Sequence, residues 1–125
     1  AEGIELLWVN NSYVFFREVN EVPADKGPLG AMNRSITTGR SIAVDPAFTK
    51  LGTPIWIEKE GAAPIHRLMV AQDTGSAIKG AQRADIFFGM GDMAGRKAGQ
   101  IKDGGRMITL LPIQMAYAML PETIE

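Results

Sequence analysis

Two aspartates, Asp73 and Asp85, stand near the ends of neighbouring strand-like runs, and a loop of small residues joins them. Such a loop can bring both carboxylates to the same rim of a sheet. A carboxylate close to a second one, and beside Phe87 and Phe88, would have its pKa raised by like charge and by desolvation, as a general acid near neutral pH needs. The alternative is that both aspartates only cap turns by accepting backbone N–H groups. The spacing leaves both interpretations open.

The run Asp73-Thr74-Gly75-Ser76 also matches the active-site loop of aspartic proteases. A chain of 125 residues could be one half of a homodimeric protease, with Asp73-Thr74-Gly75 supplying one aspartate of the catalytic dyad. In those proteases the residue before the aspartate is apolar because its strand is buried, whereas here the polar Gln72 stands at that position. The protease remains an alternative interpretation.

Composition excludes several other kinds of site. The chain has no cysteine and only one histidine, His66, so thiolate chemistry and a metal site with several histidines are impossible. Thirteen Lys and Arg stand against 14 Asp and Glu, which leaves no basic excess to attract a nucleic acid. We therefore expect carboxylate chemistry that needs neither a metal nor another cofactor.

A glycine motif follows the second aspartate. Gly89, Gly91 and Ala94 have the G-x-G-x-x-A spacing of a dinucleotide-binding turn. That fold also requires an acidic residue about 20 positions further on, in a second strand, and none stands there. We therefore expect Gly89 and Gly91 to be structural, allowing a tight turn from a strand into a helix.

The elements that must position these residues are mostly short strands. Runs rich in β-branched and aromatic residues, each bounded by Gly, Pro, Asn or Asp, predict strands at residues 13–16, 41–44, 54–58, 66–71, 84–88 and 106–111. One internal segment, 92–99, predicts a helix, and the residues after 112 are expected to cover the barrel surface. So many strands and so little helix favour an all-β fold, a small barrel, over a parallel α/β sheet.

Several motifs, taken together and in order, resemble membrane-bound lytic murein transglycosylase A over about residues 5–112. Three aspartates in sequence, Asp45, Asp73 and Asp85, are the pattern that marks the 3D domain of this family. The resemblance is carried by residues 13–17, 39–45, 51–54, 70–80, 83–91 and 94–99.

The resemblance implies a six-stranded double-psi β-barrel with one or two short helices. It also implies non-hydrolytic cleavage of the β-1,4 bond between N-acetylmuramic acid and N-acetylglucosamine in peptidoglycan. Asp85 takes the position of the single general acid/base, and Asp73 matches the neighbouring carboxylate that would orient it. The C6 hydroxyl of the muramic residue attacks C1 and closes a 1,6-anhydro ring, so water is not needed.

Other residues receive expected roles by the same resemblance. Ser76, Lys79 and Arg83 are candidates for hydrogen bonds to the glycan, and Asp45 for a structural turn. Residues 1–125 would be one domain, the C-terminal catalytic barrel portion of a larger lytic transglycosylase. Its expected partners are a peptidoglycan glycan strand and the N-terminal part of the same protein as a second chain, in the periplasm or at the outer membrane. A non-catalytic glycan-binding barrel is the alternative for the chain by itself.

Overall fold

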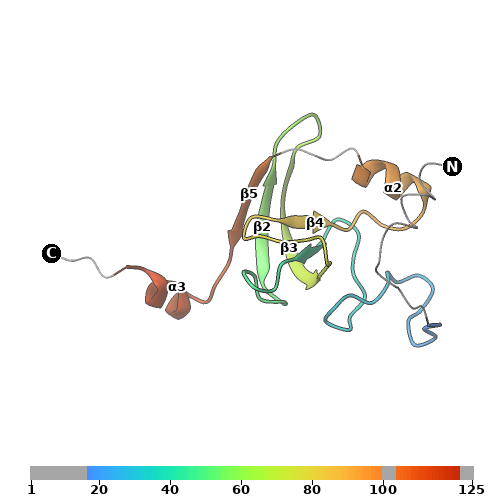
Figure 1. Ribbon diagram of the computed structural model, residues 1–125, viewed down its shortest axis with the longest axis horizontal. Helices are drawn as coiled ribbons and strands as arrows, with labels where there is room; N and C mark the ends of the chain where they lie inside the picture. The colour runs from blue at the N-terminus through green and yellow to red at the C-terminus, as the bar shows by residue number, and fades with distance from the viewer. Residues whose placement is uncertain (1–16, 100–103, 122–125) are drawn as a thin grey trace.

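The fold is built on one mixed, mostly antiparallel sheet. The structure is a computed structural model, and it describes residues 17–99 and 104–121. Within these residues five strands form a sheet in the order β4-β1-β3-β2-β5 (Figure 1). The strands are β1 (Ser41–Val44), β2 (Pro54–Lys59), β3 (Ile65–Asp73), β4 (Ala84–Ile86) and β5 (Gly105–Thr109).

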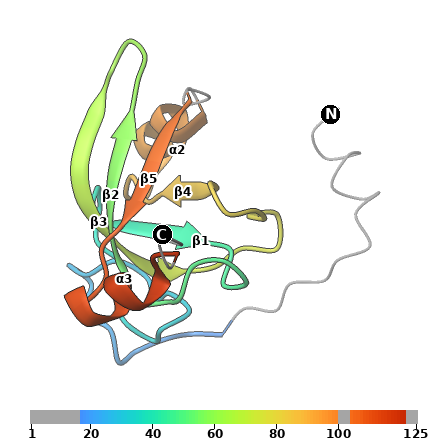
Figure 2. The same ribbon diagram turned by 90° about the vertical axis from the view of Figure 1, so that its left-hand side faces the viewer.

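The sheet is curled into a half-barrel. β1 pairs in parallel with β3 and antiparallel with β4, while β2 pairs antiparallel with both β3 and β5. The edge strands β4 and β5 come near each other (Figure 2), and residues of both line one hollow. The prediction of a mostly-β fold with two short helices is confirmed, but the described residues form five strands and not a closed barrel of six. The sixth expected strand, residues 13–16, lies outside the described part of the chain.

The core lies on one face of the sheet. In β2 the side chains alternate strictly between partly exposed and buried, as a strand with one covered face requires. The buried aliphatic side chains come from three neighbouring strands, so residues distant in sequence share one apolar cluster. Its members are Ile42, Val44, Ile55, Ile57, Met69 and Ala71.

Two helices accompany the sheet. The helix α2 (Asp92–Gly99) occupies the segment in which the sequence predicts a helix. The helix α3 (Ile113–Met119) buries none of its residues and extends away from the sheet (Figure 1). The expectation that the residues after 112 cover the barrel is therefore wrong for the described part of this tail. None of the described helices is long and apolar enough to cross a membrane.

Candidate active site

The strand register places Asp73 and Asp85 on either side of one residue. Ala43 of β1 pairs with Asp73 of β3 and, on its other side, with Asp85 of β4. Adjacent strands lie about 4.8 Å apart, so the two aspartate Cα atoms are separated by roughly 10 Å. All three residues line a hollow of about 160 Å³. The two carboxylates therefore belong to one face of the sheet.

A β-bulge brings Asp73 to that face. The pairing of β1 with β3 runs from Ile42 opposite Ala71 directly to Ala43 opposite Asp73, which leaves Gln72 as the extra residue. Without the bulge, alternation from the buried Ala71 would point Asp73 into the core as well. The bulge reverses this and turns the carboxylate outward.

A loop packs against the bulge and holds the Asp73 carboxylate. The Ala31 N–H donates to Asp73 Oδ1 at 3.0 Å, and the Met32 N–H donates to the carbonyl oxygen of Gln72 at 3.4 Å. Next to these contacts the backbone comes so close that a Cβ on Gly30 would lie 2.5 Å from the same carbonyl oxygen. Only glycine fits this approach without a shift of the loop.

Asp85 lies in a more open place than the sequence predicts. Its side chain is 51% exposed, and Oδ1 accepts a hydrogen bond from Arg83 Nε at 3.0 Å. Phe87 and Phe88 each line a hollow together with Asp85, but they leave half of its side chain exposed, because β4 points it to the partly exposed face of Ala43. Arg83, expected to contact the glycan, is the ion-pair partner of Asp85.

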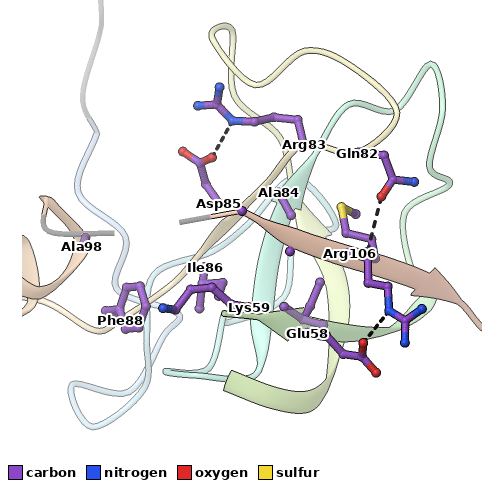
Figure 3. Close-up of a pocket in the computed structure, with 14 residues that line it drawn as sticks. Glu58, Lys59, Gln82, Arg83, Ala84, Asp85, Ile86, Phe88, Ala98 and Arg106 are labelled. Atoms are coloured by element: carbon purple, nitrogen blue, oxygen red, sulfur yellow. Dashed lines mark hydrogen bonds and ion pairs between the residues drawn. The ribbon is translucent and has the colours of Figure 1, made fainter. Parts of the chain in front are cut away.

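Asp85 also lines a second and larger hollow of about 580 Å³, between the edge strands β4 and β5. Figure 3 shows the Arg83–Asp85 pair at one end of it and the Glu58–Arg106 pair at the other. Gln82 bridges the two edges, since its Oε1 accepts the Met107 N–H at 3.4 Å. The hollow is open, charged and of the size that small-molecule sites have, about 300–1,000 Å³.

Glu58 and Arg106 form the far wall of the larger hollow. They face each other across the β2–β5 pair, and Arg106 Nε donates to Glu58 Oε2. This hydrogen bond lowers the pKa of Glu58 below its ordinary value, and the Trp56 indole N–H acts in the same direction. The same contact raises the pKa of Arg106. The wall is therefore an ion pair over the neutral pH range.

Asp45 contacts the loop that joins Asp73 to Asp85. It is 6% exposed, and its carboxylate accepts the Gly80 N–H at 2.9 Å and the Ala47 N–H at 3.0 Å. These two donors, Gly80 first, lower the pKa of Asp45. Ser76 and Lys79 lie exposed on the same loop and line neither hollow.

Gly89 and Gly91 stand in the turn from β4 into α2. Both have positive φ, 105° and 92°, a backbone region that residues with a Cβ rarely adopt. In Gly89 a Cβ would also lie 3.2 Å from Thr38 Oγ1. Their structural role remains a prediction, and the turn conformation supports it.

Comparison with known proteins shows which family this chain belongs to. The family model described as "3D domain" matches residues 40–111, which include both aspartates and all five strands. The chain belongs to the 3D domain family. The membrane-bound lytic murein transglycosylase A of Vibrio cholerae is 35% identical over an alignment of 131 positions, which covers 94% of this chain and 34% of the relative. The resemblance stated from the motifs is confirmed.

Solved structures give the same result for the fold. A membrane-bound lytic murein transglycosylase from Agrobacterium tumefaciens is 37% identical with a TM-score of 0.80, covering 94% of this chain and 33% of that one. The structure of Escherichia coli MltA with bound chitohexaose is 32% identical with a TM-score of 0.74, covering 86% and 34%. The chain spans about a third of the length of the relatives it matches.

Several residues of the site carry no signal in the sequence. Gln72 and Ala31 matter because of the bulge and of the loop that packs on it. Glu58 and Arg106 meet only because β2 and β5 pair in one particular register, 48 positions apart in the chain. Hydrophobic patterning predicts the strands, but it does not say which strands pair with one another.

Proposed function

We propose that this domain carries the catalytic carboxylate of a lytic transglycosylase that cleaves the β-1,4 bond between N-acetylmuramic acid and N-acetylglucosamine. The main support is the placement of Asp85, which flanks Ala43 together with Asp73 and opens onto the larger hollow. A half-exposed carboxylate at the edge of an open hollow is accessible to a polymer, which a closed pocket would exclude. Membership of the 3D domain family and the chitohexaose bound to a relative support the same substrate class.

In the proposed reaction Asp85 acts twice. As the acid, it gives its proton to the glycosidic oxygen while the bond from that oxygen to C1 breaks. The resulting carboxylate then takes the proton of the C6 hydroxyl, whose oxygen bonds to C1 and closes the 1,6-anhydro ring. The proton that Asp85 lost is thereby restored and no water is consumed.

Arg83 must change partners in this cycle. It neutralises the Asp85 carboxylate in the structure, and a proton-donating Asp85 has no charge for it to pair with. Both side chains are half-exposed, and ion pairs of that kind contribute little to stability, about 0–1 kcal/mol. We propose that Arg83 turns to the bound glycan, with Ser76 and Lys79 as further hydrogen-bond donors, while Asp73 orients Asp85.

A complete catalytic unit would include more polypeptide than the described sheet. We propose that this domain is the C-terminal part of a larger enzyme, as the lengths of its relatives suggest. Residues outside the described part would add the sixth strand and close a double-psi barrel, and the N-terminal part would supply the second wall of the glycan groove. The periplasm or the outer membrane is the proposed location, since the relatives are named membrane-bound.

The test is analysis of the products of peptidoglycan digestion by mass spectrometry in heavy-oxygen water. Intramolecular attack gives 1,6-anhydromuramic ends that are one water lighter than hydrolytic ends and carry no label. Asp85→Asn should remove nearly all activity, because the only acid is lost, whereas Asp73→Asn should leave a measurable remainder. Labelled reducing ends would instead indicate a hydrolase.

The aspartic protease alternative makes a different forecast for the same variants. There Asp73 would be indispensable, Asp85→Asn would be active, and peptides would be cleaved. Glycan binding without any product from the larger polypeptide would indicate the non-catalytic barrel.

A further inference from the structure

The geometry of the bulge points to a residue that holds Asp73 in position beside Asp85. We propose that Gln72, held by Ser41, is a positioning residue that keeps the Asp73 carboxylate on the same face of the sheet as Asp85. This inference rests on the proposed function for its catalytic consequence. Its structural part stands on the strand register and on the hydrogen bonds around Gln72.

The side chain of Gln72 is anchored on a buried residue. Its Oε1 accepts the hydroxyl proton of Ser41, and Ser41 is 1% exposed. The Ser41 Oγ in turn accepts the Thr37 N–H at 2.8 Å. A hydroxyl with a fixed donor and a fixed acceptor has no freedom to turn, so it fixes the Gln72 amide oxygen as well.

Ser41 connects the two strands that carry the aspartates. Through its side chain it holds Gln72, the residue before Asp73. Through its carbonyl oxygen it accepts the Phe87 N–H at 3.0 Å, two residues after Asp85. One buried residue of β1 thus fixes the position of β3 at the bulge relative to the end of β4.

The charge of Asp73 cannot replace this anchor. An ionised carboxylate avoids the core, which favours the bulged register, but that preference does not fix where the carboxylate points. The direction is set by the bulge conformation and by the Ala31 N–H that donates to Oδ1. If Gln72 loses its anchor, the bulge can relax, and both the Ala31 contact and the alignment with Asp85 are lost.

The first measurement is structural and needs no activity. In the 125-residue chain, the amide proton of Ala31 reports its hydrogen bond to Asp73 by chemical shift in an NMR spectrum. Gln72→Met keeps the side-chain length but removes the acceptor, so the Ala31 signal should move upfield. Gln72→Glu keeps an acceptor for Ser41 and should restore the signal. Ser41→Ala removes the donor from the other side and should act like Gln72→Met.

The second measurement is kinetic, on the larger enzyme of the proposed function. Gln72→Met should lower kcat by about 10-fold or more with KM for the glycan nearly unchanged, because misplacement of a catalytic group affects the reaction step. Gln72→Glu should recover most of kcat, and Ser41→Ala combined with Gln72→Met should be no worse than either change. Gln114→Met, a matched change on the exposed helix α3, should leave the rate unchanged.

The outcomes separate the two proposals. An unmoved Ala31 signal in folded Gln72→Met overturns the positioning role whatever the activity, and so does a loss of kcat that Gln72→Glu does not recover. If Gln72→Met does not fold, the Ser41→Ala spectrum decides in the same way. A wild-type enzyme that forms no anhydro product overturns the proposed function, while the NMR comparison still decides whether Gln72 positions Asp73.

Discussion

Gly30→Ala should damage the site from a distance, through the loop that holds Asp73. A Cβ at this position would lie 2.5 Å from the carbonyl oxygen of Gln72 and 2.8 Å from Ile36 Cγ2. Real Cβ atoms do not approach a backbone oxygen so closely, and a carbonyl within a strand cannot swing aside as a flexible side chain can. The loop must therefore lift away from the bulge, and the N–H of Ala31 moves with it.

The size of the effect follows from these contacts. Overpacking a well-packed site costs about 1–3 kcal/mol, and here the neighbour is backbone, so we expect the upper half of that range. For a domain of this length 1 kcal/mol corresponds to about 4 °C, which gives a decrease in Tm of roughly 8–12 °C. This estimate already includes the loss of the hydrogen bond from the Ala31 N–H, because the same movement of the loop breaks it.

The assay is thermal and urea unfolding of the 125-residue chain, followed by circular dichroism, with Gly95→Ala as the matched control. Gly95 lies inside α2 and has nothing within 4 Å of an added Cβ, so alanine there should stabilise the helix by about 0.5–1 kcal/mol. Gly30→Ala with wild-type Tm and an unmoved Ala31 amide signal would refute the steric argument and the close approach of loop and bulge.

Three further predictions concern the core, the buried carboxylate and the exposed helix. Ile55→Ala should lower the free energy of unfolding by about 2–5 kcal/mol, because Ile55 is fully buried. Phe48→Ala, at a side chain that is 65% exposed, should lower it much less, and urea unfolding of both variants measures the difference. The N–H of Gly80 lowers the pKa of Asp45, so the ionised carboxylate stabilises the fold above its ordinary pKa of 3.8, and this stabilisation is lost as pH falls through the lowered value. Asp45→Asn should therefore melt lower at pH 7 and lose less stability than the wild type on acidification; an unchanged acid response would contradict this. Met119→Lys should decrease self-association of the isolated chain in sedimentation experiments, because this side chain is 71% exposed on a helix that carries several other exposed apolar side chains. Unchanged sedimentation would show that α3 does not mediate association.

Local patterning predicts most of the strands. The runs at 41–44, 54–58 and 106–111 match β1, β2 and β5 closely, because they are rich in apolar and β-branched residues and are bounded by turn-forming residues. The run at 84–88 is shorter than predicted, since β4 ends at Ile86. Even so, the Phe87 N–H still donates to the Ser41 carbonyl oxygen at 3.0 Å. Local sequence encodes the tendency to extend, and the end of pairing depends on the partner strand.

The site is predictable only in part for the same reason. The two aspartates stand out because carboxylates at strand ends are chemically conspicuous. The bulge at Gln72 is not visible in the sequence, since it exists only in relation to β1. The exposure of Asp85 could not be predicted from the neighbouring Phe87 and Phe88 either, because β4 ends before both of them and the packing around a strand depends on distant segments of the chain.

The order of the strands has a consequence for the rate at which the site can form. β2 and β3 are neighbours in sequence and pair as a hairpin, which requires only a short loop to close. The contacts that define the site join distant segments instead: 42 positions separate Ala31 from Asp73, and 35 separate Asp45 from Gly80. Distant contacts form late because the entropy of the intervening chain must be lost first. We therefore expect the hairpin to gain protection from hydrogen exchange early in refolding, and the surroundings of the two aspartates to gain it last.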